Sequence, residues 1–341
     1  MAKPLQMDVE CLELRTRHPF IIARGGRSEY RTIWVRLRDD DGNVGWGEAT
    51  PSSFYGETAE TVRAALDRYA GALPADPFDV EETERRWEAS LRINASARAA
   101  LSGALHDLIG KRLGIPLYRL WGLDPAKAPR STFTIGLDTP ERIRLKVEEA
   151  AEYPILKIKL GTDRDAEILR TIREATDREI RVDANCGWTV KQAIEMLPVL
   201  REFGVTVLEQ PLPPDQIAGL AEISRRATIP VVADESCRTA VDIPPLVGAV
   251  DGINIKLAKC GSLREALRMI AVARAHGLMV MVGCMIESSL GITAAAHFTP
   301  LVDIVDLDGA ALLASDPFVG ATIAGGQVAL PDGPGLGVRK R

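Results

Sequence analysis

The feature that most constrains the fold is a strict alternation of short strand-like runs and amphipathic helical segments, which begins near Ser131. Most intervals between the runs have the apolar spacing of a helix, for example DAEILRTIREA. Two of these helical segments are followed by Gly204 and Gly277, and glycine commonly follows the last helical residue. Eight strands joined by helices predict a (β/α)8 barrel of the TIM type. The runs are TFTIG, ILKIKLG, EIRVDANC, VTVLEQP, PVVADES, GINIKLAK, LMVMVGC and DIVDLDG.

A doubly wound open sheet is the competing α/β fold. It usually has fewer strands and often carries a glycine-rich turn that binds phosphate. No G-x-G-x-x-G follows the first strand-like run, and G-x-x-x-x-G-K-[ST] does not occur in the sequence. We therefore expect the barrel.

The chain before about residue 125 is organised differently, with strand-like segments first and helical segments afterwards. TIWVRLRD and VGWGEAT flank the turn residues DDDGN, so they predict a β-hairpin. Helical patterns follow over residues 57–69 and 95–113. We expect a small α+β domain over residues 1–125 and the barrel over residues 126–314.

Charged residues stand at the ends of the middle strand-like runs. In a TIM barrel the reacting groups lie at the C-terminal ends of the strands, whereas the bodies of the strands are apolar. From the second run to the sixth, consecutive charged positions are 22 to 26 residues apart, the length of one strand–helix unit. All of these side chains should therefore point into one barrel mouth. They are Lys157 and Lys159, then Asp183, Glu209 and Asp234, then Lys256.

A single carboxylate at a strand end caps the next helix or pairs with a lysine about as often as it has a function. Three carboxylates on consecutive strands repel one another, and burying them without a cation is costly. Oxygen ligands without cysteine or histidine select Mg²⁺, or else Mn²⁺, over zinc. The four histidines stand apart and form no HExxH pair, so we expect them to be structural. Asp183, Glu209 and Asp234 are the predicted metal ligands.

The same residues carry a family resemblance. K-x-K on the second barrel strand, D, E and D on the next three and a lysine on the sixth resemble the muconate-lactonizing subgroup of the enolase superfamily. GWGEA near the N-terminus, DAN at Asp183, EQP at Glu209 and GCMIESSLG at Gly283 extend the resemblance over nearly the whole chain. It implies that the first domain caps the barrel mouth and that residues 315–341 return to pack on that domain.

The resemblance also implies the chemistry, which is removal of a proton from the carbon next to a substrate carboxylate to give an enediolate. Lys159 and Lys256 are implied as the bases, and Lys157 as a contact to the carboxylate. Because Lys159 and Lys256 come from strands four apart, they should face opposite sides of the substrate. That arrangement suits racemisation or epimerisation by an isomerase. Cycloisomerisation and syn-dehydration stay open, although the seventh strand lacks the histidine base typical of acid-sugar dehydratases.

The eighth strand-like run, IVDLDG, places Asp306 and Asp308 two residues apart and hence on one face. The simpler interpretation is a pair of carboxylates satisfied by backbone or lysine. The functional interpretation is a clamp for a substrate ammonium group, and D-x-D at this place resembles the dipeptide epimerases. Muconate or chloromuconate cycloisomerase, o-succinylbenzoate synthase and N-acylamino acid racemase are the alternatives, and their substrates present no ammonium there.

The identity of the dipeptide depends on two loops of the first domain, residues 19–31 and 50–57. Arg24 and Arg27 carry guanidinium groups suited to a carboxylate, although a solvated loop charge is an equal interpretation. Phe54 and Tyr55 in the second loop favour an apolar pocket instead. By the resemblance, Arg24 is a candidate for binding the side chain in an L-Ala-D/L-Glu epimerase. Glu287, in GCMIESSLG, is a further candidate for substrate binding.

The bulk properties exclude several classes of partner. The net charge is −5, so no broad basic surface favours nucleic acid or anionic membrane. No apolar run reaches the length of a membrane helix, and the N-terminus lacks the pattern of a signal peptide. The five scattered cysteines predict neither disulfides nor a zinc site. We expect a cytoplasmic enzyme with a small dipeptide substrate, assembled as a homo-oligomer.

Overall fold

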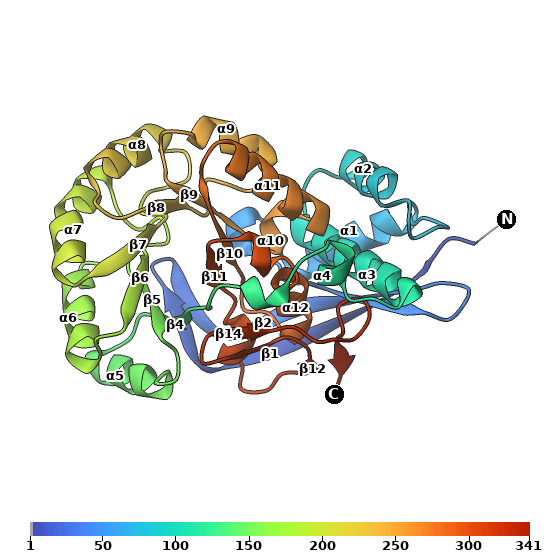
Figure 1. The fold of residues 1–341 in the computed structure, drawn as a ribbon, viewed down its shortest axis with the longest axis horizontal. Helices are drawn as coiled ribbons and strands as arrows, with labels where there is room; N and C mark the ends of the chain where they lie inside the picture. Colours follow the sequence, from blue (N-terminus) through green and yellow to red (C-terminus); the bar gives the residue numbers. More distant parts are fainter. Residues whose placement is uncertain (1–2) are drawn as a thin grey trace.

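The computed structural model describes residues 3–341, and its central feature is a barrel of eight parallel strands (Figure 1). The strands are neighbours in sequence order, and the first and last close the ring where the Thr132 amide donates to the Val305 carbonyl at 3.1 Å. All eight predicted strands are therefore confirmed. They are β4 (Phe133–Ile135), β5 (Ile155–Lys159), β6 (Glu179–Asp183), β7 (Val205–Glu209), β8 (Val231–Ala233), β9 (Gly252–Ile255), β10 (Met279–Gly283) and β11 (Ile304–Asp306).

Helices form the outer layer of the barrel, and Figure 1 shows the strands inside the arc that these helices make. The connection after β9 contains a short extra turn, α10 (Leu257–Cys260), before its main helix. No regular helix follows β11, where the chain forms only the 3₁₀ turn η5 (Gly309–Leu312), so the barrel is a modified one. The outer helices are α5 (Pro140–Glu149), α6 (Asp165–Ala175), α7 (Val190–Glu202), α8 (Ile217–Arg226), α9 (Ile243–Leu246), α11 (Leu263–Ala275) and α12 (Ser289–Ala296).

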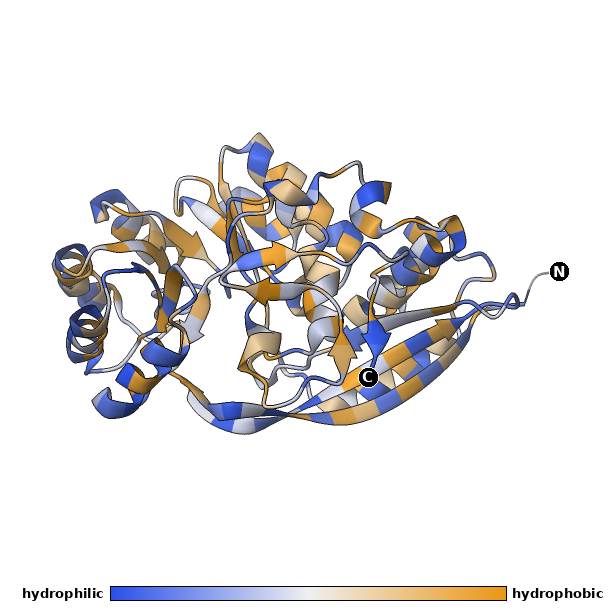
Figure 2. Ribbon diagram, turned by 60° about the horizontal axis from the view of Figure 1, so that its bottom comes forward, coloured by the Kyte–Doolittle hydropathy of each residue, from blue (hydrophilic) through white to orange (hydrophobic). Residues whose placement is uncertain are grey.

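The N-terminal part is an antiparallel sheet covered by helices, as predicted. Strands β1 (Gln6–Ile22), β2 (Gly25–Arg38) and β3 (Val44–Ala49) pair in sequence order, and Figure 2 shows hydrophilic and hydrophobic residues alternating along the long strands. This alternation buries one face of the sheet. Helices α1 (Ala59–Ala70) and α3 (Ala95–Leu113) match the two predicted ones. Helix α2 (Val80–Ser90) was not predicted, because its sequence, VEETERRWEAS, is mostly charged.

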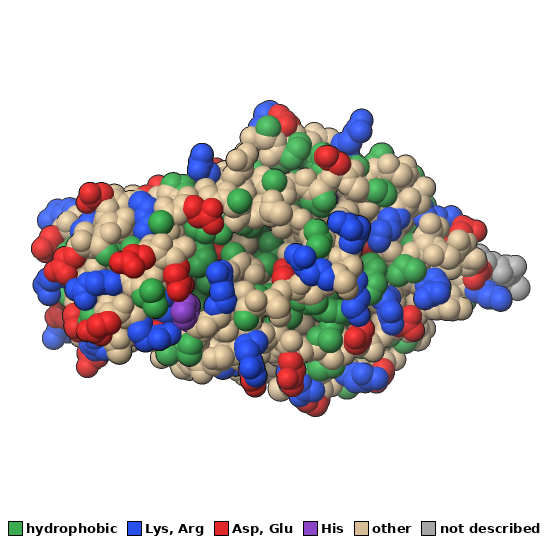
Figure 3. All heavy atoms as spheres, turned by 90° about the horizontal axis from the view of Figure 1, so that it is seen from below, with side chains coloured by type: hydrophobic (Ala, Val, Ile, Leu, Met, Phe, Trp, Pro, Cys, Tyr) green, Lys and Arg blue, Asp and Glu red, His purple; other side chains and the backbone are tan. Residues whose placement is uncertain are grey.

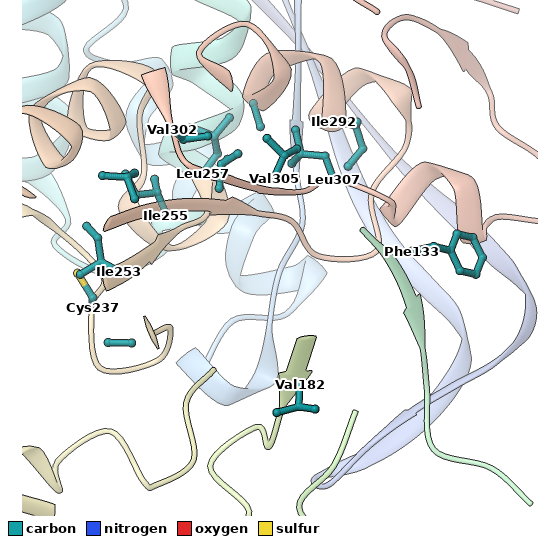
Figure 4. Close-up of a cluster of buried hydrophobic side chains, with 14 of the residues drawn as sticks. Phe133, Val182, Cys237, Ile253, Ile255, Leu257, Ile292, Val302, Val305 and Leu307 are labelled. Carbon is teal, nitrogen blue, oxygen red and sulfur yellow. The ribbon is translucent and has the colours of Figure 1, made fainter. Parts of the chain in front are cut away.

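The apolar side chains of the barrel strands belong to two separate clusters. Figure 4 shows part of the larger one, in which Val182, Ile253 and Val305 come from different strands and Ile292 comes from α12. A smaller cluster unites Val207, Val232, Met281 and Ile304. Side chains alternate along a strand, so residues two positions apart lie on the same face. Glu209, Asp234 and Asp306 come two positions after Val207, Val232 and Ile304. They therefore lie on the same face as this smaller cluster, one layer nearer the C-terminal mouth. The strand period thus aims the charged groups inward.

The C-terminal segment contacts the N-terminal part of the chain. The Phe318 ring lies edge-on to Trp34 and Trp46, with centroid distances of 4.5 and 5.4 Å. The Leu336 amide donates to Asp107 of α3 at 2.7 Å. These contacts are what we expect if residues 315–341 return to the capping domain. The boundary between the capping domain and the barrel at residue 125 stays a prediction. Among residues 3–341, no helix is long and apolar enough to cross a membrane.

Candidate active site

A cavity of about 300 Å³ lies between the C-terminal ends of the barrel strands and the turn that joins β1 to β2. Figure 3 shows hydrophobic side chains gathered in the hollowed centre of one face of the molecule, with charged side chains around them. The barrel contributes most of the charged groups of the cavity, and the N-terminal domain closes it with loop residues. The lining includes Lys157, Lys159, Asp234, Lys256, Asp306 and Asp308 from the barrel and Arg24, Arg27, Phe54 and Tyr55 from the loops.

Asp183, Glu209 and Asp234 converge at the base of this mouth. Asp183 and Glu209 end β6 and β7 and are partners in the strand register, and Asp234 follows β8. All three are at most 1% exposed, and one carboxylate oxygen of each lies within 4.8 Å of the others. Three buried carboxylates without a histidine or cysteine suit a hard divalent cation such as Mg²⁺.

Unpaired buried oxygens around the three carboxylates give an independent test of this fit. Within residues 3–341, Asn185 Oδ1, Glu235 Oε2 and Asn254 Oδ1 are buried and accept no hydrogen bond. Each belongs to a residue that adjoins the cluster: Asn185 and Asn254 donate to Asp183 and Glu209, and Glu235 follows Asp234. Buried acceptors normally have partners, and a hydrated cation would bring them. The residues present therefore fit the ion.

Three lysines balance the charge of the cluster. Lys157 Nζ lies 2.6 Å from both Glu209 and Asp306, Lys159 Nζ lies 2.7 Å from Asp183, and Lys256 Nζ lies 2.7 Å from Asp234. Burial alone would lower the pKa of Lys157, but Asp306 and Glu209 outweigh it and hold that pKa above its ordinary value. Lys159 ends β5 and Lys256 follows β9, so the two approach the cluster from opposite sides of the ring.

A fourth lysine, Lys259, was missed by the sequence reasoning. Its side chain is fully buried, and its Nζ contacts Asp234 Oδ1 and the Asp234 carbonyl at 2.5 Å each. It also donates to the carbonyls of Cys237 and Asn254 at 2.9 Å. The sequence did offer a signal for it, because Lys259 is the second lysine of KLAK and lies one turn of α10 after Lys256.

The backbone is held in unusual conformations within three residues after two of the predicted metal ligands. Asn185, Cys186 and Gln210 have positive φ angles of 47°, 64° and 34°. Non-glycine residues rarely adopt this region, and such strain is concentrated at functional sites. The conformation of Gln210 is held by its own side chain. Its side-chain oxygen accepts hydrogen bonds from the backbone amides of Asp234 and Ser236 at 2.8 and 3.1 Å. The glutamine of the EQP motif thus ties the end of β7 to the end of β8.

Asp306 and Asp308 both line the cavity at the seam where the barrel closes. Asp306 accepts from Lys157 and from the Thr132 hydroxyl, and Asp308 accepts from the Thr134 amide at 2.5 Å. Burial and the nearby Asp306 raise the pKa of Asp308 to about 7. The structure therefore brings the predicted pair into the cavity, with Asp306 already paired to a lysine.

The two remaining candidates are placed differently from what we expected. Arg24 reaches the cavity, but its guanidinium donates to Glu235 at 2.8 Å and to the Asn185 carbonyl at 2.6 Å. Glu287 lies outside the cavity lining and accepts the Met285 amide at 2.9 Å. It borders a separate small cavity with Glu48, where burial and that second carboxylate raise the pKa of Glu287 to about 8. This placement does not favour contact between Glu287 and a substrate in the large cavity.

Comparison with known proteins agrees with this geometry. Residues 6–122 match the model of the mandelate racemase/muconate lactonizing enzyme N-terminal domain, and residues 141–340 match the enolase C-terminal domain-like model. The L-Ala-D/L-Glu epimerase of Bacteroides thetaiotaomicron is 43% identical over 330 residues, 96% of this chain and 86% of that protein. The hydrophobic dipeptide epimerase of a Flavobacteria bacterium is 40% identical over 335 residues, 95% of each chain.

A solved structure extends the similarity to the fold. The dipeptide epimerase of Enterococcus faecalis, in complex with Mg and L-Leu-L-Tyr, matches with a TM-score of 0.93 and 32% identity over 98% of this chain and 99% of that one. A capped barrel with three strand-end carboxylates and lysines on both sides defines an enzyme of the enolase superfamily. Within that superfamily, this chain belongs to the mandelate racemase/muconate lactonizing enzyme family. The predicted fold and family are confirmed.

Proposed function

We propose that this protein is a Mg²⁺-dependent dipeptide epimerase that inverts the α-carbon of the C-terminal residue, with L-Ala-D/L-Glu as the best candidate substrate. The observation that carries the proposal is the presence in one cavity of Lys159, Lys256 and the Asp306/Asp308 pair. The lysines provide proton transfer, and the aspartates provide a site for a substrate ammonium group. Relatives that are 43% and 40% identical and named as epimerases support it.

Proton transfer uses the two lysines from opposite sides of the barrel. One neutral lysine removes the α-proton from one face of the substrate, and the other, as an ammonium, returns a proton to the opposite face. Each lysine is the acid in one direction and the base in the other, so the same pair interconverts both epimers. Lys157, between Glu209 and Asp306, supplies a fixed positive charge where the substrate carboxylate enters.

Asp183, Glu209 and Asp234 would hold the Mg²⁺ ion. When bound, the ion supplies a Lewis acid that attracts the substrate carboxylate and stabilises the negative charge that develops as the α-proton leaves. Gln210 and Lys259 keep Asp234 in position for this role. The loops of the capping domain line the cavity above the reacting groups.

The aspartate pair distinguishes a dipeptide from an N-acylated amino acid. Asp306 is paired with Lys157, whereas Asp308 accepts from the Thr134 amide and has no lysine or arginine within ion-pair distance in residues 3–341. An ammonium placed between them would complete the charge balance of this end of the cavity. Burying that ammonium is favourable only if it meets such carboxylates.

A substrate screen tests the proposal. Dipeptides are incubated with the enzyme and Mg²⁺ in D₂O, and deuterium uptake is followed by mass spectrometry. We expect incorporation of one deuterium at the α-carbon of the C-terminal residue of free dipeptides and little incorporation into their N-acetyl or N-succinyl analogues. Efficient turnover of N-acyl amino acids, with free dipeptides inert, would instead assign the protein to the racemases of N-acylamino acids.

A further inference from the structure

The carboxylate of Glu209 is held at both of its oxygens. Lys157 Nζ lies 2.6 Å from Oε2, and the side-chain amide of Asn254 donates to Oε1 at 2.8 Å. Asn254 belongs to β9 and is fully buried, so water does not compete for this hydrogen bond. Because Lys157 comes from β5 and Asn254 from β9, Glu209 is oriented from two sides of the barrel.

Asn254 and Lys256 share one face of the extended backbone at the end of β9. They are two residues apart, and Lys256 keeps extended dihedral angles, with φ −129° and ψ 131°. Both side chains contact predicted metal ligands. The residues that alternate with them, Ile253 and Ile255, join the larger apolar cluster, part of which Figure 4 shows. The amide and the predicted base therefore lie side by side at the barrel mouth.

Gly283, at the end of the neighbouring strand β10, leaves the space that these two side chains fill. A Cβ atom at this position would lie 2.8 Å from both terminal atoms of the Asn254 amide and 3.0 Å from Lys256 Cε. Non-bonded carbon atoms prefer about 3.5–4.0 Å, so any side chain here would displace its neighbours. The backbone does not require the glycine, because its φ angle lies outside the left-handed region. Glycine within a strand often marks such a close approach.

We propose that Asn254 is a positioning residue that orients Glu209 for the metal ion, and that position 283 is a glycine because Asn254 and Lys256 occupy its side-chain space. One missing side chain thus serves both the predicted metal site and one predicted base. Both residues act through others, Asn254 through Glu209 and Gly283 through Asn254 and Lys256. The inference deepens the proposed function, and only its catalytic test rests on that function.

Calorimetric titration with Mg²⁺ tests the role of Asn254 without substrate. Asn254→Leu keeps the approximate size of the side chain and removes the donor to Glu209. Loss of a group that orients a metal ligand typically lowers metal affinity on the order of ten- to a hundredfold, and we expect a loss of that size. Gly283→Ala should also weaken binding, because it displaces the same amide.

Gly103→Ala is the matched control for the glycine substitution. Gly103 is a buried glycine of α3, and a Cβ atom there would approach no other part of the chain closer than 3.6 Å. This variant should bind Mg²⁺ as the unmutated protein does. Unchanged Mg²⁺ affinity in folded Asn254→Leu would overturn the positioning role of Asn254.

A double-mutant cycle tests the role of Gly283. Gly283→Ala should lower the free energy of unfolding, measured by chemical denaturation. In the Asn254→Ala background, where the amide no longer fills the space, the same substitution should lower it less. If Gly283→Ala alone does not fold, the double variant should nevertheless fold. Equal losses in both backgrounds, or failure of the double variant to fold, would overturn the claim that the glycine accommodates Asn254.

The catalytic test is α-hydrogen exchange of a dipeptide in D₂O at saturating Mg²⁺. Asn254→Leu should slow the exchange of both epimers by a similar factor, because the ion serves both. Gly283→Ala should slow one epimer more, and it should be the epimer that Lys256→Ala fails to exchange. Equal slowing of both epimers in Gly283→Ala would overturn the link to Lys256. If the unmutated enzyme exchanges no dipeptide, the proposed function fails, and the calorimetric and denaturation measurements still decide the inference.

Discussion

The ammonium nitrogen of Lys259 lies 2.5 Å from both the Oδ1 atom and the backbone carbonyl oxygen of Asp234. This contact fixes one oxygen of the carboxylate, while the other, Oδ2, faces Lys256 at 2.7 Å. Lys259 thereby sets the rotamer of a predicted metal ligand and, through it, the position of a predicted base. Because neither Lys259 nor Asp234 is exposed, the pair is not screened by solvent.

We predict that Lys259→Met lowers both the free energy of unfolding and the affinity for Mg²⁺. Removing one partner of a buried ion pair leaves the other charge uncompensated, which typically costs about 3 kcal/mol or more. Chemical denaturation and calorimetric titration with Mg²⁺ measure the two effects. Lys191→Met is the matched control, since its pair with Glu195 is exposed and 3.8 Å long. Unaltered Mg²⁺ affinity in a folded Lys259→Met would show that the lysine does not position Asp234.

Metal dependence follows from the three converging carboxylates. Chelation should abolish proton exchange, and added Mg²⁺ or Mn²⁺ should restore it. Asp183→Asn, Glu209→Gln and Asp234→Asn each remove one charged ligand, so calorimetry should show Mg²⁺ affinity falling by at least tenfold in each. Full turnover by the metal-free enzyme would contradict the assignment of these residues.

The aspartate pair should act through the substrate ammonium and hardly at all through the metal. A hydrogen bond between ionised groups contributes about 1.5–3 kcal/mol, so Asp308→Asn should lower kcat/KM on a dipeptide on the order of ten- to a hundredfold. Mg²⁺ affinity should stay nearly constant in this variant. Asp306→Asn should behave similarly but also disturb Lys157, because the two are paired at 2.6 Å. If dipeptide turnover is unchanged by both substitutions, Asp306 and Asp308 do not bind the substrate ammonium group.

Stability should fall on acidification through His297. Its Nδ1 accepts from the Tyr118 amide at 3.2 Å and its Nε2 lies 3.2 Å from the Leu336 carbonyl, which fixes a neutral ring. Burial lowers the pKa of His297 to about 4, against about 6.5 in the unfolded chain. The unfolded state therefore takes up a proton first, and stability is lost as the pH falls from about 6.5 to 4, by up to roughly 3 kcal/mol.

Denaturation at several pH values measures this contribution. The slope of unfolding free energy against pH between 4 and 6.5 should be smaller in His297→Asn than in the unmutated protein. His276→Asn, at an exposed position, is the control and should leave the slope as it is. Equal slopes in the unmutated protein and His297→Asn would show that His297 is not the group responsible.

The barrel and most of the charged groups at its mouth were predictable because both depend on local patterns. The strand period of two and the repeat of one strand–helix unit place Asp183, Glu209 and Asp234 together without any knowledge of distant contacts. The pairing of Arg24 with Glu235 was not predictable, because it joins residues 211 positions apart across two domains. Lys259 was overlooked for a related reason, since a lysine on a short helical turn normally faces solvent. The placement of Glu287 beside Glu48 at a separate small cavity is likewise a distant contact that the sequence does not reveal.

The central claim is that Lys159 and Lys256 transfer protons on opposite faces of one substrate carbon. It is tested most directly by α-hydrogen exchange in D₂O with Lys159→Ala and Lys256→Ala, using each pure epimer of the dipeptide and resolving the products by chirality and mass. Both variants should lose net epimerisation. Each should still exchange deuterium into one epimer only, and the two variants should prefer opposite epimers, because the remaining lysine reaches only its own face. Equal exchange of both epimers by both variants would contradict the two-base account.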